Sequence, residues 1–228
     1  MPLHRSLLAL ALLSAHAVAS AQLAYFPSTG AGDVVLPVTS IKQARLAGTL
    51  LQKYDFSCGS AALATLLTHH YGTPIDEQSV FTEMYSQGDQ AKIQREGFSL
   101  LDMKRFLANR DFQADGFDQP LEKLLQARIP AIVLINENGY QHFVVVKGLQ
   151  DDRVLVGDPA QGTRALSRVA FDAIWQSKLL FVIHNRMDQA RFNLAAEWRV
   201  APRAPMGSNG MRAGLGSFAL PKHGPGDF

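Results

Sequence analysis

The apolar residues of this chain change their spacing near residue 129, and this change limits the fold more than any other feature. Between 58 and 128 they recur at helical spacing, whereas from 129 to 184 they form short runs rich in β-branched residues. Helices that precede strands, instead of alternating with them, indicate an α+β domain. The chain has 228 residues, enough for one such domain with extensions.

Turn and capping residues divide the helical part. We expect helices over 58–70, 76–85, 99–109 and 120–128, a surface loop over 87–97 and a short strand over 112–117. Gly72 and Pro74 follow the first helix in the order that ends helices. Ser99, with Asp102 three residues later, resembles a capping box that starts another.

The second part is typical of an antiparallel meander. Strands are expected over 129–136, 140–149, 153–157 and 178–184, with a short helix over 167–175. Asn138-Gly139 and Asp151-Asp152 are turn signals between the first three strands. The sequence therefore predicts a helical N-terminal half and a C-terminal antiparallel sheet.

The N-terminus is typical of an export signal. His4 and Arg5 precede the apolar run Leu7–Leu13, and Ala19-Ser20-Ala21 offers small residues for cleavage. A retained membrane anchor is the alternative, but the apolar run is far shorter than the about 20 residues that a span needs. Residues 1–21 therefore predict a signal peptide and, with it, a periplasmic protein.

Two further segments flank the predicted domain at 48–187. Residues 22–47 are expected to be irregular or extended, with a short strand at Val34–Leu36. Residues 188–228 lose periodicity and become rich in Gly and Pro, which predicts a flexible tail.

Composition excludes several classes of function. The net charge is +2 and 18% of residues are charged, so there is no basic stripe of the kind that binds nucleic acid. No Gly-rich phosphate loop lies between a strand and a helix, which argues against a nucleotide site. The spacing of His, Cys, Asp and Glu does not match a metal site, so no metal or cofactor is expected.

The single cysteine, Cys58, stands where a loop enters the first helix. In an oxidising compartment a lone cysteine is a buried inert thiol, an intermolecular cross-link or a reactive residue. Amides at a helix start favour the thiolate and can hold an oxyanion, and Gly59 would let a substrate approach. Gln52 offers a further side-chain donor to that oxyanion.

His142 and Asp158 are the candidates for a base and its partner. His142 begins a strand, where its imidazole can take a proton from a thiol. A hairpin with its turn near 150–152 would bring Asp158 beside it, and the carboxylate can then fix the imidazole tautomer. The alternatives are a histidine bonded within the sheet and an aspartate in a turn before Pro159. His69 and His70 close a helix and are expected to face solvent.

Together these motifs resemble peptidase family C39, the papain-like domains that trim bacteriocin leader peptides. The resemblance rests on Gln52-x5-Cys58-Gly59-x-Ala61, His142-Phe143-Val144-Val145-Val146 and Asp158-Pro159-x-x-Gly162, and it covers about 48–185. It implies a papain-like fold with Cys58 as nucleophile, His142 as base, Asp158 as orienter and Gln52 as oxyanion donor. Ser57 departs from the pattern, because Asp is frequent there in the family.

The resemblance and the export signal together indicate an exported cysteine peptidase. Many family members belong to membrane exporters with an ATPase, whereas this chain is similar to stand-alone members that accompany functional-amyloid secretion. The expected partners are an exported protein or peptide substrate, cut after a Gly-Gly-type site, and secretion-system components. A binding or assembly factor that holds an exported chain in a papain-like groove without cutting it is the alternative.

Overall fold

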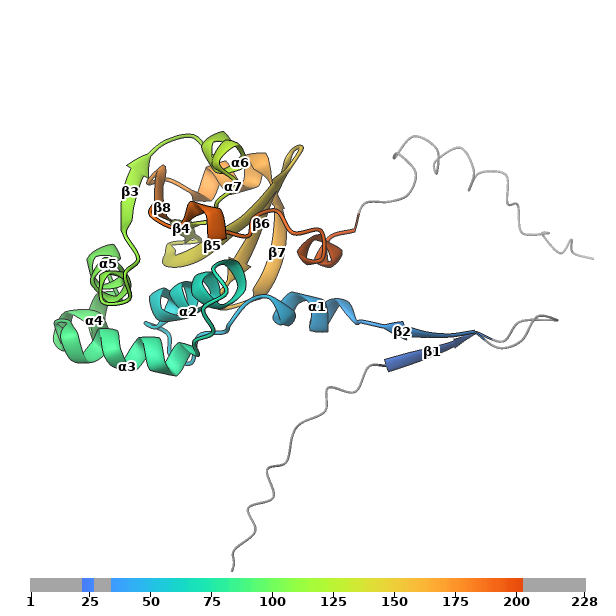
Figure 1. Cartoon of the computed structure of the whole chain (residues 1–228), viewed down its shortest axis with the longest axis horizontal. Coiled ribbons are helices and arrows are strands. Elements are labelled where there is room, and N and C mark those ends of the chain that lie inside the picture. Colours follow the sequence, from blue (N-terminus) through green and yellow to red (C-terminus); the bar gives the residue numbers. More distant parts are fainter. Residues whose placement is uncertain (1–21, 27–33, 203–228) are drawn as a thin grey trace, which may run out of the picture. The chain divides into compact units, whose positions relative to one another are not determined.

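The computed structural model describes residues 22–26 and 34–202, which fall into two units (Figure 1). In the first unit, residues 1–40, β1 (Gln22–Phe26) pairs antiparallel with β2 (Val34–Val38). The strand expected at Val34–Leu36 is therefore present. The predicted signal peptide lies outside the described residues.

The second unit, residues 41–228, combines helices with a six-stranded sheet. Its helical elements are α1 (Ile41–Ala47), α2 (Cys58–Thr65), the π-helix η1 (Leu66–His70), α3 (Glu77–Gln87), α4 (Gln90–Glu96), α5 (Leu100–Ala108), α6 (Glu122–Ala127), α7 (Arg168–Ile174) and the short 3-10 helices η2 (Met187–Gln189) and η3 (Glu197–Val200). The strands follow the spatial order β3 (Ala114–Asp118), β8 (Leu179–Ile183), β4 (Ala131–Glu137), β5 (Tyr140–Gln150), β6 (Arg153–Asp158) and β7 (Gly162–Ser167), and neighbours are antiparallel. The predicted α+β class is confirmed.

Strand β5 lies inside the sheet and is buried on both faces. Phe143 and Val145 join the apolar cluster that α2, α3 and α5 contribute to, whereas Val144 and Val146 join the cluster of α6 and α7. Figure 1 shows these two sets of helices on opposite sides of the sheet. A strand covered on both faces has a continuous apolar run instead of an alternating one, which explains its pattern in the sequence.

Helix α2 is buried along its whole length. It is rich in Ala, Gly and Ser, whose small side chains let a helix approach its neighbours closely. A Cβ on Gly59 would lie 2.9 Å from Phe98 Cβ and 3.0 Å from Met103 Cε. Close packing therefore requires glycine at this position, and the expectation that Gly59 makes room for a substrate is wrong.

The loop expected over 87–97 contains a helix, α4. The Asp89 side chain accepts a hydrogen bond from Lys92 N–H (3.0 Å) and so caps the helix, and Gly97, with φ of 79°, ends it. Ile93 is buried on its inner side. One apolar residue in a short polar segment gives too weak a periodicity to predict a helix.

Helix α1 and strand β7 were not predicted either. Helix α1 occupies the end of the segment expected to be extended, and strand β7 follows β6 through a tight connection. Gly162, with φ of 80°, pairs with Asp158 at the start of this hairpin. Strand β7 carries Arg164 next to Asp158, which is important for the site.

Residues 188–202 pack against the rest of the second unit, so a flexible tail starting at 188 is wrong for this part. The buried ammonium group of Lys147 pairs with the Glu197 carboxylate and also donates to Gly48 O (2.5 Å). Burial lowers the pKa of Lys147 and raises that of Glu197, because both charged forms lose hydration. This packing depends on a partner far away in sequence, which local composition cannot reveal. Residues 203–228 lie outside the described part of the chain.

The same segment covers His70, which is fully buried, while His69 is half-buried; the expectation that both face solvent is wrong. His70 Nδ1 lies 2.6 Å from Arg191 O, and Arg191 N–H donates to His70 O (2.8 Å). Burial lowers the pKa of His70 to about 3, helped by the charge of Lys147. The imidazole is therefore neutral and donates its Nδ1–H to the Arg191 carbonyl.

Candidate active site

Cys58 is the first residue of α2 and is 7% exposed. The preceding loop is closed by Ser57, whose N–H and hydroxyl both donate to Tyr54 O (3.0 Å each). Ser57 makes no side-chain cap to the helix. The amides at the start of α2 are thus not used by a capping side chain, and they remain available to a negative charge near the cysteine.

Burial raises the pKa of the Cys58 thiol above its ordinary value. Hydrogen bonds from the N–H groups of Phe143, Gly59 and Cys58 itself oppose this shift, and the charge of Asp158 adds to it. The amides at the helix start thus lower the pKa of Cys58, as expected, but burial outweighs them, so the expectation of a thiol that is more acidic overall is wrong. A thiol of this kind needs a base to remove its proton.

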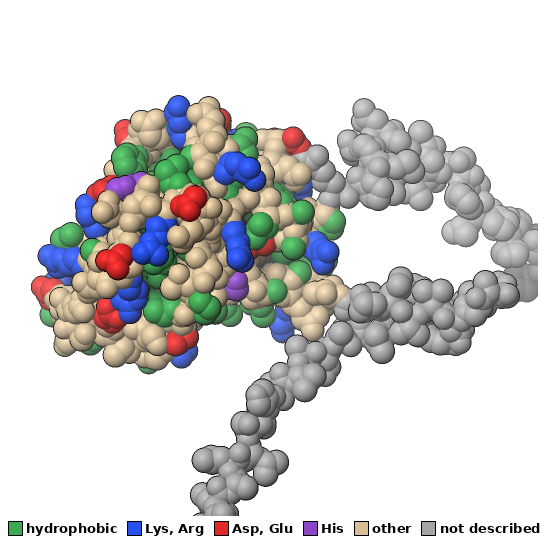
Figure 2. Space-filling model, in the orientation of Figure 1, with side chains coloured by type: hydrophobic (Ala, Val, Ile, Leu, Met, Phe, Trp, Pro, Cys, Tyr) green, Lys and Arg blue, Asp and Glu red, His purple; other side chains and the backbone are tan. Residues whose placement is uncertain are grey.

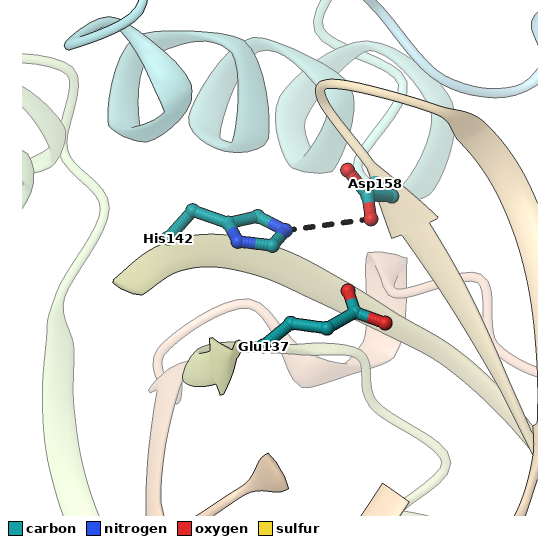
Figure 3. A group of neighbouring side chains, drawn as sticks. All are labelled: Glu137, His142 and Asp158. Carbon is teal, nitrogen blue, oxygen red and sulfur yellow. Dashed lines mark hydrogen bonds and ion pairs between the residues drawn. The ribbon is translucent and has the colours of Figure 1, made fainter. Parts of the chain in front are cut away.

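His142 and Asp158 are buried and lie together, as the hairpin predicted. His142 Nε2 is 3.4 Å from Asp158 Oδ2. In Figure 3, the carboxylates of Asp158 and Glu137 both lie on the Nε2 side of the imidazole ring. Asp158 Oδ1 accepts a hydrogen bond from Ala160 N–H (2.8 Å). Burial disfavours the charge of Asp158, but these hydrogen bonds and the charge of Arg164 hold the pKa of its carboxyl below the ordinary value.

The other ring nitrogen of His142, Nδ1, is buried and has no hydrogen-bond partner among the residues that the structure describes. Since Phe143 directly follows His142 and its N–H acts on the Cys58 thiol, the start of β5 lies against the start of α2. The imidazole therefore has one nitrogen engaged by a carboxylate and one free. This is the arrangement that a general base requires.

Tyr140 contacts both His142 and the loop before Cys58, and no motif in the sequence pointed to it. Its ring stacks on His142, with centroids 5.0 Å apart and an angle of 27° between the planes. Its hydroxyl donates to Asp55 O (3.1 Å) in the loop before Cys58. Its position two residues before His142 on the same strand is the one signal in the sequence that could have found it.

Gln52 lies in the same loop, but its side chain is turned toward the loop backbone. Its Nε2 donates to Tyr54 O (3.1 Å) and more weakly to Asp55 O (3.5 Å), and its main-chain N–H donates to Pro159 O (2.9 Å). Its Oε1 is buried and unpartnered among the described residues. The structure thus ties Gln52 to the turn that follows Asp158, and one amide hydrogen is only weakly engaged.

Arg164 and Glu137 complete the site, and sequence reasoning missed both. Arg164 Nε and Nη2 lie 3.1 and 3.0 Å from Asp158 Oδ2. Its Nη1 and Nη2 lie 3.1 and 2.7 Å from the two oxygens of Glu137. No local pattern signals this network, because its members come from four different strands.

The donor atoms of Glu137, His142 and Asp158 lie within 4.8 Å of one another, a spacing that can hold a metal ion. However, the Arg164 guanidinium is bonded to both carboxylates. The guanidinium already offsets one of the two negative charges and would repel a second cation. The donor set therefore fits a hydrogen-bonded network better than a metal centre.

On the face drawn in Figure 2, acidic and basic side chains are interspersed, which agrees with a net charge of +2. Within residues 22–26 and 34–202, none of the helices has the length and apolar character that a membrane span requires.

Comparison with known proteins identifies the family of the chain. The profile of the Peptidase C39 family matches residues 48–187. A probable functional amyloid protease, FapD, of Pseudomonas aeruginosa is 40% identical over 183 residues, which cover 80% of this chain and 81% of that protein. The protein of the same name from Pseudomonas fluorescens is 38% identical over 188 residues, covering 82% and 83%.

Among solved structures, the chain is similar to a double glycine motif protease from an AMS/PCAT transporter in complex with the leader peptide. The two are 25% identical, with a TM-score of 0.48 over 59% of this chain and 88% of that chain. The family profile and the FapD relatives establish the identity expected from the motifs: the chain belongs to the peptidase C39 family and is a cysteine peptidase.

Proposed function

We propose that the chain is an exported endopeptidase that cuts a secreted or periplasmic protein with Cys58, His142 and Asp158. The observation that carries this proposal is the placement of His142. Its Nε2 faces Asp158 and its Nδ1 is free, while the next residue, Phe143, contacts the Cys58 thiol. A base with this orientation beside a protonated thiol supports nucleophilic catalysis.

In the proposed reaction, His142 Nδ1 takes the thiol proton as Cys58 Sγ attacks the carbonyl carbon of the scissile peptide bond. The carbonyl oxygen becomes an oxyanion. When the bond to nitrogen breaks, the proton passes from the imidazolium to the leaving amine and a thioester remains on Cys58. Water then attacks the thioester, with His142 taking its proton and returning it to the sulfur. Asp158 stays ionised and holds the imidazole in one tautomer.

The oxyanion needs donors at the start of α2. The amides there support this role, because no side-chain cap uses them. Gln52 is the proposed second donor, and it can contribute by redirecting the amide hydrogen that points weakly at Asp55. The main-chain hydrogen bond from Gln52 to Pro159 O would hold the residue in the loop while its side chain turns.

The relatives support the proposed substrate class. Two of them are named as probable functional amyloid proteases, so we propose that the substrate is an exported protein of an amyloid-forming or similar secretion system. A Gly-Gly-type cleavage site and a periplasmic location after removal of residues 1–21 belong to the same proposal. Components of the secretion machinery are proposed partners.

Mass spectrometry of exported proteins encoded beside this chain tests the proposal. Strains carrying the natural chain, Cys58→Ser or His184→Ala are compared. His184 is a matched control, because it pairs with Asp115 at 3.0 Å outside the site. New termini are expected with the natural chain and His184→Ala and not with Cys58→Ser. If the natural chain yields no new termini and Cys58→Ser leaves secretion unchanged, a binding factor would be supported instead.

A further inference from the structure

We propose that Arg164 is a positioning residue of this site: its guanidinium, clamped by Glu137, holds the Asp158 carboxylate in the orientation that meets His142. The inference rests on the proposed function, since it gives Arg164 a role in the same reaction. Arg164 would touch neither the substrate nor the reacting atoms, and it would act through Asp158.

The geometry of the guanidinium carries the inference. Three of its nitrogen atoms are bonded to two carboxylates, with Arg164 Nε and Nη2 on Asp158 and Nη1 and Nη2 on Glu137. A planar group held on two edges has little freedom to rotate. The Arg164 side chain is 13% exposed and that of Asp158 is 0% exposed, so water screens these contacts weakly.

The Asp158 carboxylate is fixed at both oxygens by this arrangement. Ala160 N–H holds Oδ1, and Arg164 holds Oδ2, the oxygen that also faces His142. The contact between Oδ2 and the imidazole is long, at 3.4 Å. An interaction at this distance aligns an imidazole only if the carboxylate itself cannot turn away, and Arg164 supplies that constraint.

Arg164 also joins two hairpins. Glu137 ends β4 and His142 is the third residue of β5, so these two residues belong to one hairpin. Asp158 and Arg164 belong to the next hairpin, β6–β7. The bridge from Glu137 through Arg164 to Asp158 therefore fixes the position of the base relative to its partner.

Charge reinforces this role. The charged and titratable groups around Asp158 are His142 from β5, Arg164 from β7, Glu137 from β4 and Cys58 from α2. Without the guanidinium, the Glu137 carboxylate would repel that of Asp158 with no cation between them. The pKa of Asp158 would then rise, and a protonated Asp158 accepts the imidazole N–H more weakly and cannot stabilise the imidazolium by charge.

The rate at which iodoacetamide alkylates Cys58 in the full chain, from about pH 4 to about pH 9, tests the inference. Arg164→Met removes the charge, and Arg164→Lys keeps the charge but loses the planar fork. Arg168→Met is the matched control, because Arg168 also bridges two carboxylates, those of Glu122 and Asp172, away from the site.

We expect Arg164→Met to slow alkylation about tenfold near neutral pH and to move the acid limb of the profile to higher pH. Arg164→Lys should restore the acid limb but not the full rate, and Arg168→Met should match the natural chain. If Arg164→Met does not fold, as judged by circular dichroism, Glu137→Gln loosens the clamp instead and should also slow alkylation.

A natural rate and acid limb in both Arg164→Met and Glu137→Gln, with slow alkylation in His142→Ala, would overturn the role of Arg164 and leave the proposed function standing. Equal alkylation of the natural chain and His142→Ala would contradict the proposed function itself. The role of Arg164 would then fall with it, because there would be no base to position.

Discussion

His142 and Asp158 meet as a diagonal pair across the β5–β6 hairpin, with Nε2 and Oδ2 3.4 Å apart. The register places Val145 opposite Gly157, and a bulge between Val146 and Gly148 changes the register between this pair and the turn. Asp158 is thus close to His142 without being directly opposite. The pairing depends on the bulge and on contacts outside the hairpin, and this makes it sensitive to substitutions there.

Asp158→Asn should make the protein less stable at neutral pH and remove part of its sensitivity to acid. The folded-state pKa of Asp158 lies below its unfolded value, so ionised Asp158 stabilises the fold above about pH 4. This contribution disappears as the pH falls through the folded-state pKa. We expect a loss of about 2 kcal/mol at pH 7 that shrinks on acidification. Urea unfolding at several pH values measures it.

Asp118→Asn, at an exposed carboxylate in β3, serves as the control and should change little. A stability difference for Asp158→Asn that stays constant between neutral and strongly acid pH would show that ionisation of Asp158 is not its source.

Glu197→Gln should destabilise the fold by roughly 3 kcal/mol, because it leaves the Lys147 ammonium group buried without a counter-charge. The double variant Lys147→Met/Glu197→Leu should recover most of this loss, since burial opposes both charges of the pair. Lys92→Met at the exposed Lys92–Glu96 pair is the control and should cost less than about 1 kcal/mol. Chemical denaturation of the natural chain and the three variants measures these free energies of unfolding. A double variant as unstable as Glu197→Gln would contradict the idea that the unpaired Lys147 charge causes the loss.

Truncation should separate the packed part of the C-terminal segment from the remainder. A chain that ends after Pro202 keeps Glu197 and the Arg191 contact with His70, and its Tm should stay close to the natural value. A chain that ends after Arg186 loses both and uncovers two buried polar side chains, so its Tm should fall clearly. Equal Tm values for the two truncated chains would mean that residues 187–202 contribute nothing to stability.

Tyr140→Ala should slow alkylation of Cys58 by about two- to tenfold, because the ring that stacks on His142 is lost. Tyr140→Phe keeps the ring and loses only the hydrogen bond to Asp55, so it should stay closer to the natural rate. Iodoacetamide labelling followed by mass spectrometry gives both rates. If Tyr140→Phe is alkylated as slowly as Tyr140→Ala, the hydroxyl and not the stacked ring determines the reactivity of Cys58.

Much of the fold could be predicted because local patterns reflect it. The β-branched runs, the turns at Asn138-Gly139 and Asp151-Asp152, and the capping box of Ser99 and Asp102 all correspond to observed elements. Strand β7 was not predicted because Thr163 and Arg164 interrupt its apolar pattern, although Thr163 is buried. Helix α4 was not predicted because its single buried apolar residue, Ile93, gives no helical periodicity.

The candidate site was predictable only where it depends on neighbours in sequence. A cysteine at a helix start and two residues on one hairpin have local signals, so Cys58, His142 and Asp158 could be named. The acidity of Cys58 was misjudged because burial is set by distant packing. Arg164 and Glu137 come together through sheet order, which no local pattern encodes. The catalytic roles of all these residues stay predictions.

The alkylation rate of Cys58 in His142→Ala, compared with the natural chain and with His184→Ala at neutral pH, tests the central claim most directly. If His142 is the base for this thiol, His142→Ala should react at least about tenfold more slowly, since general-base assistance is worth that much or more. His184→Ala, which removes the imidazole of the pair with Asp115, should react like the natural chain. Equal rates in all three proteins would contradict the assignment of Cys58 and His142 as a catalytic pair.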